Sequence, residues 1–275
     1  MIATYHNHSR WSDGRATIAE VIATARTLAI DELGVSDHFT LHPEGIEPSW
    51  SMKPSRISDY IAELQELAND PDAPGSPAIR IGLEIDWFTG HADRIGEVIS
   101  ALPLDYAIGS VHYVGGSEID GSPARWERMT QPERDGTHEQ YWRNIAELAQ
   151  SGVFDIVAHL DLPKKFGYRA SRDLKPVMHA ALDAIAAAPR PLVVELNTAG
   201  WFKPCQDAYP ALDILRACRK RDIPVTISAD AHDPAHLLRA FDRAAERLTE
   251  AGYDEIARFR GREMSLEPIA EAVRT

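Results

Sequence analysis

The chain has 275 residues, of which 44% are hydrophobic and 26% are charged, so it can bury a full core without disulfide or metal staples. Its 42 acidic and 29 basic side chains give a formal net charge of −13. That charge argues against a nucleic-acid backbone or an anionic membrane surface as the main partner. A small anion bound at a locally positive, metal-loaded site remains compatible with it.

The cysteines and the N-terminal residues indicate the cellular compartment in which the protein is expected. Cys205 and Cys218 form no Cys-x-x-Cys motif and no disulfide framework, which indicates a reducing environment. The opening residues MIATYHNHSRW lack a basic stretch followed by an apolar run, so no secretory signal is predicted. No stretch approaches 18 consecutive apolar residues, so no membrane span is predicted either. We therefore expect a cytoplasmic protein.

Short β-type runs alternate with helical patterns along the chain. The predicted strands are 2–5, 32–37, 79–86, 106–112, 154–159, 191–197 and 223–230, and the predicted helices are 18–29, 55–68, 95–102, 139–150, 174–187, 212–219 and 235–251. A capping box at 17–20 precedes the first helix. Residues 69–78 read as a turn-rich loop, 113–136 as a long irregular stretch, and 256–275 as a tail packed on the outside. Within the irregular stretch, Gly115–Gly136 is a candidate lid over a substrate.

Seven β-then-α units predict a parallel sheet with helical crossovers. Several strands, such as LVVEL and FDIVA, are nearly continuous apolar runs, which is typical of a sheet buried on both faces. Seven units favour a distorted (β/α)7 TIM-like barrel over an open α/β sheet. We expect residues 1–275 to form a single domain of this kind.

A histidine or a carboxylate follows every predicted strand. His6, His8 and Asp13 follow the first strand, Asp37 and His38 the second, Glu84 and Asp86 the third, His112 the fourth, His159 and Asp161 the fifth, Glu195 and Asn197 the sixth, and Asp230 and His232 the seventh. Each residue alone is equally explained as a hydrogen-bonded histidine or a helix-capping aspartate. In parallel α/β barrels, however, the carboxyl ends of the strands converge on one active site.

The residue types in this set point to metal ions. Imidazole and carboxylate groups bind Zn, Fe or Mn. The number of such groups exceeds what one four- to six-coordinate ion needs, and it suits two or three ions that share a bridging carboxylate. Glu84, on a middle strand, is the natural bridge.

Several motifs resemble the PHP (polymerase and histidinol phosphatase) family, specifically its histidinol-phosphate phosphatase branch. The motifs are HNH at 6–8, SDG at 12–14, SDHF at 36–39, GLEID at 82–86, GSVHY at 109–113, AHLDLPKKFG at 158–167, ELNTAG at 195–200 and SADAHDP at 228–234. They occur in order over nearly the whole chain, so the set is specific although each motif alone is not.

The resemblance implies a distorted seven-stranded barrel that holds three divalent metal ions. By position, His6, His8, Glu84 and Asp230 correspond to the ligands of the first ion, Glu84, His112 and His159 to those of the second, and Asp13, His38 and His232 to those of the third. All nine positions carry a residue that can bind metal.

The resemblance also implies hydrolysis of L-histidinol phosphate to L-histidinol and phosphate, a reaction of histidine biosynthesis. A hydroxide bridging two ions would attack phosphorus in line, while the ions neutralise charge on the phosphoryl oxygens. Glu84 and Asp230 are the expected catalytic carboxylates at the metals. Asp161 is a candidate general acid for the leaving group, and a metal-bound water is the alternative.

Cations near the end of the fifth strand and after the sixth are candidates for phosphate binding. They are Lys164, Lys165, Arg169 and Lys203. Position 164 and position 202, which is Phe202, often carry arginine in the family, so the phosphate contacts are expected to differ here. Trp87, Trp201 and Glu118 are candidate neighbours for the cationic histidinol moiety. A solvated basic turn and packed tryptophans are the alternatives.

Other functions remain open. A phosphatase of the same family acting on a nucleotide or sugar phosphate would use the same metal site. An amidohydrolase on a similar barrel is a second alternative, although the fourth strand lacks the lysine that some of those enzymes carbamylate. A third alternative is a non-catalytic metal-binding regulatory module, in which ligands are expected to be missing. The acidic chain argues against a DNA-proofreading role.

Overall fold

The computed structural model describes residues 1–69 and 75–269. Its strands are β1 (Ala3–Thr4), β2 (Glu32–Val35), β3 (His38–Phe39), β4 (Ala78–Asp86), β5 (Tyr106–Ser110), β6 (Tyr113–Val114), β7 (Ser117–Glu118), β8 (Ile156–Val157), β9 (Val193–Asn197), β10 (Val225–Ser228), β11 (Glu255–Arg260) and β12 (Glu263–Pro268). Its α-helices are α1 (Ile18–Thr27), α2 (Ile57–Ala68), α3 (Ala92–Ala101), α4 (Pro123–Arg128), α5 (Gln131–Ser151), α6 (Lys175–Ala186), α7 (Leu212–Arg219) and α8 (Phe241–Ala251). The short 3-10 helices are η1 (Pro54–Arg56), η2 (Leu162–Lys164), η3 (Thr198–Phe202) and η4 (Pro234–His236).

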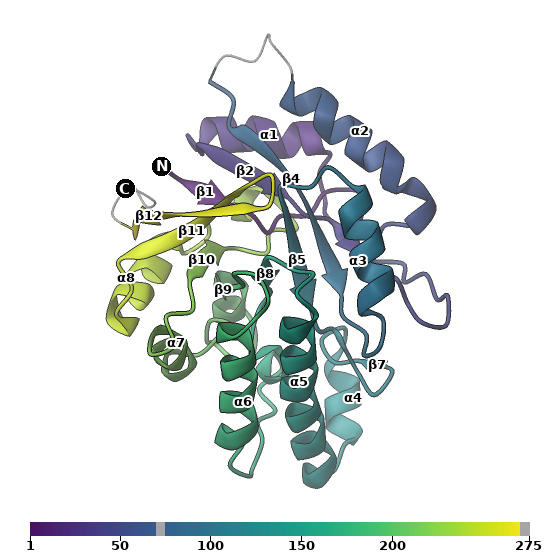
Figure 1. Cartoon of the computed structure of the whole chain (residues 1–275), viewed down its shortest axis with the longest axis vertical. Coiled ribbons are helices and arrows are strands. Elements are labelled where there is room, and N and C mark those ends of the chain that lie inside the picture. Colours follow the sequence, from purple (N-terminus) through teal and green to yellow (C-terminus); the bar gives the residue numbers. More distant parts are fainter. Residues whose placement is uncertain (70–74, 270–275) are drawn as a thin grey trace.

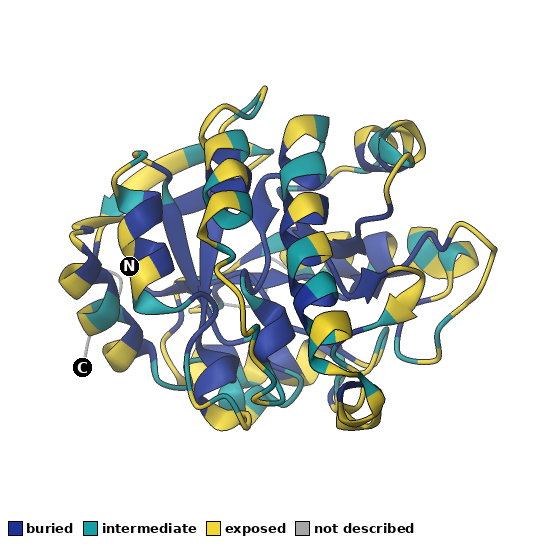
Figure 2. Ribbon diagram, turned by 90° about the horizontal axis from the view of Figure 1, so that it is seen from below, coloured by how far each residue is buried: buried dark blue, intermediate teal, exposed yellow. Residues whose placement is uncertain are grey.

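The central sheet is parallel and curls into a barrel. Its strands follow the order β1-β2-β4-β5-β8-β9-β10, and β3 adds a second pairing along β4. A parallel bridge between Asn7 and Ala231, just beyond β1 and β10, joins the two ends of this sheet. The helices lie around the strands (Figure 1), and their buried sides face the buried sheet (Figure 2). The predicted (β/α)7 barrel is therefore confirmed.

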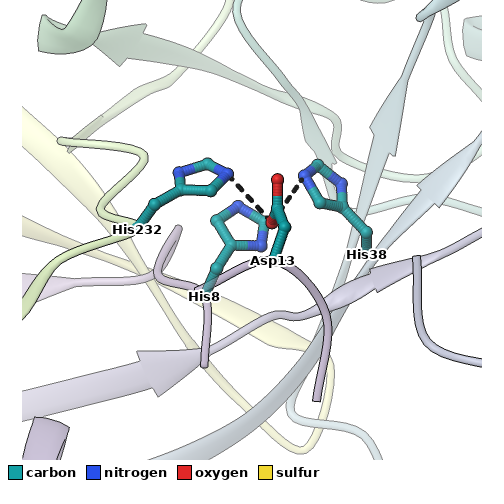
Figure 3. Close-up of side chains that lie close together, drawn as sticks. All are labelled: His8, Asp13, His38 and His232. Atoms are coloured by element: carbon teal, nitrogen blue, oxygen red, sulfur yellow. Dashed lines mark ion pairs between the residues drawn. The ribbon is translucent and has the colours of Figure 1, made fainter. Parts of the chain in front are cut away.

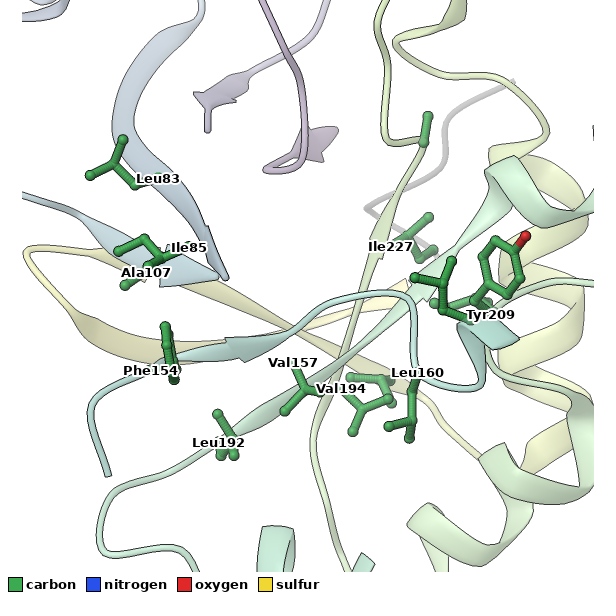
Figure 4. Close-up of a cluster of buried hydrophobic side chains, with 14 of the residues drawn as sticks. Leu83, Ile85, Ala107, Phe154, Val157, Leu160, Leu192, Val194, Tyr209 and Ile227 are labelled. Atoms are coloured by element: carbon green, nitrogen blue, oxygen red, sulfur yellow. The ribbon is translucent and has the colours of Figure 1, made fainter. Parts of the chain in front are cut away.

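The core has an outer and an inner layer, because successive strand residues point to opposite faces. Outward residues such as Leu83, Ile85 and Val194 belong to one large cluster of buried hydrophobic side chains (Figure 4), which also includes residues of the helices. Inside the barrel, Tyr5 and Tyr106 meet edge to face, with ring centroids 5.2 Å apart. A Cβ atom on Gly82 would overlap the Tyr106 ring, so the glycine makes room for this tyrosine in the barrel interior.

The sequence suggested that the C-terminal tail, 256–275, packs on the outside of the barrel, but the structure shows a different arrangement. The described part of the tail forms an antiparallel hairpin, β11–β12, that lies over the amino-terminal end of the barrel. Phe259 packs 5.7 Å from Tyr5, and Arg262 donates to Asp155 at 2.9 Å. The hairpin therefore closes the end of the barrel opposite to the carboxyl ends of the strands. Residues 270–275 of the predicted tail and 70–74 of the predicted loop lie outside the described residues.

Two other expectations about elements were wrong. The stretch 113–136 is not irregular, since it contains the β6–β7 hairpin, α4 and the first turns of α5. A capping box of Thr130 and Glu133 starts α5 at Gln131, eight residues before the predicted start. The last helix begins at Phe241, because Ala240 has a left-handed backbone with φ of 61° that separates it from η4. The predicted capping box of Thr17 and Glu20 is confirmed.

Candidate metal centre

Nine of the predicted side chains meet at the carboxyl ends of the strands. They form four overlapping groups whose ligand atoms lie within 4.8 Å of one another. The groups are His8, Asp13, His38 and His232; His6, His159 and Asp230; His6, His8 and Glu84; and His38, Glu84 and His112. Each proposed ligand of the sequence analysis occurs in at least one group. The cluster is therefore continuous and is larger than a single ion requires.

Glu84 stands at the centre of this cluster with its two oxygens directed to different histidines. Its Oε2 lies 2.6 Å from Nδ1 of His38 and 3.1 Å from Nε2 of His6. Its Oε1 lies 2.9 Å from Nε2 of His159 and 3.6 Å from that of His112. A carboxylate with this geometry can bridge two cations. Alternation along β4 explains its position, since Leu83 and Ile85 point outward into the core.

A second set surrounds Asp13, which the loop after β1 presents (Figure 3). Its Oδ1 lies 3.2 Å from Nε2 of His232 and 3.7 Å from that of His38. The ring of His8 stands between these two histidines, 4.2 Å from each ring centroid. This set equals the expected ligands of the third ion with His8 added, and His8 also belongs to a group with His6 and Glu84, so it could serve either set.

The loop that carries Asp13 is held by a buried carboxylate. Asp37 accepts from the backbone N–H and the hydroxyl of Ser9, at 2.8 and 2.7 Å, and from the hydroxyl of Ser12 at 2.5 Å. A Cβ on Gly14 would meet the His8 backbone at 2.5 Å, so only glycine allows this tight turn. Asp37 therefore positions a ligand without belonging to the metal groups.

Two more strand-end carboxylates orient histidines from behind. Glu195 lies 2.7 Å from Nδ1 of His6, and Asp86 lies 2.8 Å from Nδ1 of His112. Such contacts fix the ring and leave Nε2 to face a metal. Backbone strain also marks this end of the barrel, since Asp230 has φ of 50° and His159 of 23°.

The donor atoms fit metal ions rather than an internal hydrogen-bond network. Six buried atoms of the cluster make no hydrogen bond of good geometry among the described residues: His6 Nε2, His8 Nδ1, His8 Nε2, Glu84 Oε2, His159 Nδ1 and Asp230 Oδ1. Four of them lie only at ion-pair distance from one another, with His6 Nε2 near Glu84 Oε2 and His8 Nε2 near Asp230 Oδ1. Buried polar atoms are rarely left unpaired, and cations are one common explanation. The site is therefore built to bind divalent metal.

The charges of the cluster agree with this interpretation. Burial alone would raise the pKa of Glu84, yet the surrounding imidazoles, His38 first, hold it well below its usual range. Asp13 likewise has its pKa lowered to about 2, because hydrogen bonding to His232 and the charges of His38, His232 and His8 together outweigh burial. Burial and the neighbouring His38 lower the pKa of His8 to about 3. The carboxylates are thus ionised and His8 is neutral at pH 7, as ligands must be.

A cavity of about 510 Å³ opens above the cluster. Its walls include Asp13, His38, His112, His159, Asp230 and His232 from the cluster. Of the predicted phosphate-binding cations, Lys165 and Lys203 line the cavity. Burial, together with the nearby Lys165 and Arg239, lowers the pKa of Lys203. The chemistry available here is that of a metal cluster beside cationic side chains.

Three predicted residues do not reach the cavity. Lys164 is buried in ion pairs with Asp161 at 2.8 Å and Asp207 at 3.0 Å. Asp161, expected as a general acid, therefore faces a lysine rather than the cavity, although burial raises its pKa. The side chain of Arg169 is exposed to solvent and is not part of the cavity wall.

The expected aromatic neighbours are also elsewhere. Trp87 packs in the core against Phe154, and Trp201 lies beneath the guanidinium of Arg243. Trp50 lines the cavity instead and donates to Glu118 at 2.9 Å. Glu118, the expected acidic neighbour, is in the cavity wall.

Sequence reasoning missed several residues of the wall, among them Trp50, Asp120 and Arg239. They come from loops and short elements with no periodic signal. Asp120 pairs with Lys165 at 3.0 Å and belongs to the stretch considered as a lid. A sequence signal for Asp120 was its place beside Glu118 in an acidic pair within that stretch. We find no helix in the described chain that is long and apolar enough to cross a membrane.

Comparisons with known proteins place the chain in a family. The sequence model of the PHP domain matches residues 4–199. A Deinococcus radiodurans protein named "Probable histidinol-phosphatase" is 35% identical over 250 residues, which cover 90% of this chain and 92% of that protein. The histidinol-phosphatase of Lactococcus lactis is 22% identical, with 94% of each chain covered.

A crystal structure shows the same fold. Histidinol phosphate phosphatase from Lactococcus lactis, complexed with zinc, L-histidinol and phosphate, superposes with a TM-score of 0.76 at 21% identity, over 96% of this chain and 98% of that one. The resemblance inferred from the motifs is confirmed, and the chain belongs to the PHP domain family.

Proposed function

We propose that this protein is a metal-dependent phosphomonoesterase that hydrolyses L-histidinol phosphate to L-histidinol and phosphate. The observation that carries the proposal is the cluster of nine ligand-type side chains below a cavity with cationic residues in its wall. The names of the relatives supply the substrate, since two of them are histidinol-phosphatases by name and one was crystallised with L-histidinol and phosphate. We further propose that residues 1–275 act as one catalytic domain.

The nine side chains would hold up to three divalent ions, with Zn, Fe or Mn as the candidates. Bound ions would lower the pKa of a water in the cluster and would neutralise charge on the phosphoryl oxygens. Glu84 would contribute one oxygen to each of two ions, because its two oxygens face different histidines. Asp230 would join the ligands that follow β1, since its Oδ1 lies 3.2 Å from Nε2 of His8.

The cavity walls differ in charge in a way that suits this substrate. Lys203, without a carboxylate partner in the described chain, offers a positive charge to a phosphate. Glu118, which has no salt bridge in the described chain, adds negative charge to the wall, where the imidazole and amine of histidinol would be favoured. Trp50, held by Glu118, supplies an aromatic face for the cation.

One preparation tests the function. Metal content is measured by elemental analysis, and turnover is compared for L-histidinol phosphate and a panel of nucleotide and sugar phosphates. We expect two or three ions per chain and the highest kcat/KM for L-histidinol phosphate. A higher kcat/KM for another ester would mean that this ester is the substrate, while the proposed phosphatase chemistry would still hold. A metal-loaded protein that turns over none of these esters would contradict the proposal.

A further inference from the structure

We propose that Arg239 binds the phosphoryl group of the substrate, from a seat formed by the ring of Phe202. The proposal rests on the phosphatase function proposed above and adds a substrate-binding residue to it. Arg239 lies between η4 and α8, far in sequence from the other cavity residues except Asp230, His232, Asp233 and His236.

The side chain of Arg239 lines the cavity without an ion-pair partner in the described part of the chain. Its Nε atom is buried and has no hydrogen-bond partner there. Burial lowers the pKa of this guanidinium, and Asp230 opposes that effect. A buried donor on a charged group is costly unless it is paired, so an anion in the cavity would satisfy it.

The guanidinium stacks on an aromatic ring. Its carbon lies 4.2 Å from the centroid of the Phe202 ring, and Phe202 is otherwise an exposed residue. The backbone carbonyl of Arg239 accepts from the hydroxyl of Thr198 at 2.7 Å. Thr198 and Phe202 both belong to η3, so one short helix binds both the backbone and the side chain of this arginine. The planar guanidinium is itself pre-organised, so it loses less entropy per hydrogen bond when it binds an oxyanion.

The neighbouring arginines show that this arrangement is specific. Arg15 also lines the cavity, but it is largely exposed and pairs with Asp233 at 3.1 Å. Arg243 stacks on Trp201 in a similar way, yet it is exposed and is not part of the cavity wall. Arg239 differs from both, because it lines the cavity, stacks on the Phe202 ring and has an Nε donor without a partner in the described chain.

The charge around Arg239 favours an anion. Lys203 is the residue after η3. Burial lowers its pKa, and the positive charges of Lys165 and Arg239 contribute to this lowering. Lys165 is neutralised by Asp120, whereas Lys203 and Arg239 have no salt bridge in the described chain. Two unpaired cations on one wall of an acidic protein indicate a place for phosphate, and the planar guanidinium can offer two parallel N–H bonds to its oxygens.

The test measures phosphate binding and turnover in the metal-loaded protein. Arg239→Met and Arg239→Lys are compared with Arg243→Met, which removes a stacked guanidinium outside the cavity. Calorimetry gives Kd for inorganic phosphate, and kinetics give kcat and KM for L-histidinol phosphate. Elemental analysis and circular dichroism check that metal content and fold are unchanged.

We expect Arg239→Met to raise the Kd for phosphate about 10- to 100-fold, as for the loss of a hydrogen bond to a charged group. Arg239→Lys should recover part of this loss, because lysine keeps the charge and loses the fork. Phe202→Ala should weaken phosphate binding by a smaller factor and should have no further effect in the Arg239→Met background. Arg243→Met should bind phosphate as the unmodified protein does.

Failure of this proposal is distinguishable from failure of the proposed function. Unchanged phosphate affinity in Arg239→Met, or equal losses in Arg239→Met and Arg243→Met, would overturn the role of Arg239. If the unmodified protein binds phosphate and Arg239→Met does not, Arg239 is supported even when L-histidinol phosphate is a poor substrate. In that case only the choice of substrate fails.

Discussion

The ammonium of Lys164 lies 3.0 Å from a carboxylate oxygen of Asp207, and its side chain is 1% exposed. The same nitrogen lies 2.8 Å from Asp161, so one buried cation holds two carboxylates together. The nitrogen also lies over the Tyr209 ring, 5.7 Å from its centroid. Lys164 therefore joins η2 to the chain after η3 behind the cavity wall, and its charge is already neutralised.

Lys164→Met should mainly reduce stability. Removal of the buried Lys164 leaves Asp161 without its lysine and leaves Asp207 with only the longer contact to Arg247 at 3.5 Å, so we expect a loss of about 3 kcal/mol in the free energy of unfolding. Urea denaturation followed by circular dichroism measures it. Lys165→Met is the matched control, because Lys165 lines the cavity and should change KM more than stability. If Lys164→Met keeps native stability and raises KM, Lys164 binds the substrate and the structural role is wrong.

Glu84→Gln should remove metal without unfolding the protein. The amide keeps the shape of the side chain but loses the charge that faces His38 on one side and His159 on the other. We expect up to two ions fewer per chain by elemental analysis. Activity should fall more than about 100-fold, beyond the range seen when only outer partners of metal ligands are lost.

Glu118→Gln is the control for Glu84→Gln. Glu118 lines the cavity and accepts from Trp50 and Tyr113, but it belongs to none of the metal groups. It should keep the full metal content and change KM for the proposed substrate. Full metal content in Glu84→Gln would show that this residue does not bridge ions.

Metal removal should change the pH dependence of stability. In the metal-free cluster, burial lowers the pKa of His232, but hydrogen bonding to Asp13 and the charge of Asp230 raise it to about 9. Burial likewise opposes the carboxylates around His112, Asp120 first, which raise its pKa to about 10. A raised folded-state pKa gives stability that is complete below pH 6.5 and is lost as pH rises towards 9 or 10.

The metal-free protein in chelator should therefore become less stable from pH 6.5 to 9. The metal-loaded protein should become more stable when pH rises from 5 to 7, since protons compete with metal for the same histidines. Thermal denaturation at each pH measures both trends. His232→Gln should show a shallower decline in chelator. Rising stability of the metal-free protein between pH 6.5 and 9 would refute the raised pKa values.

The barrel could be predicted from sequence because its strands are short apolar runs spaced by helical patterns. The prediction failed where tertiary contacts decide the element. The β11–β12 hairpin is stabilised by Phe259 against Tyr5, a contact between residues more than 250 positions apart. The early start of α5 depends on the capping box at Thr130, whose signal is short and lies within a loop-like composition.

The metal cluster could be predicted because ligands at strand ends occupy positions that topology brings together. The cations could not, since spacing does not show which lysine is paired. Lys164 and Lys165 are adjacent, yet one is buried behind the wall and the other is in it. At position 202 the sequence showed a phenylalanine in place of a cation. The structure places the guanidinium of Arg239 on that ring, a link that no local pattern shows.

Glu195 provides a test of the residues that support the cluster without joining it. Its Oε1 lies 2.7 Å from Nδ1 of His6, and its Oε2 accepts from the backbone N–H of His159 at 2.7 Å. Glu195 thus orients two ligands at once, one that follows β1 and one that follows β8. Glu195→Gln should weaken metal binding about 10- to 100-fold, as for other outer partners of metal ligands.

The measurement for Glu195→Gln is competition with a chromogenic chelator. The fold should remain, because the amide can still accept from the His159 backbone, whereas the negative charge beside His6 is lost. Asp86→Asn, which removes the corresponding charge beside His112, should weaken metal binding by a similar factor. Glu118→Gln should bind metal normally. Native metal affinity in both Glu195→Gln and Asp86→Asn would mean that these carboxylates hold the barrel together and do not tune the ligands.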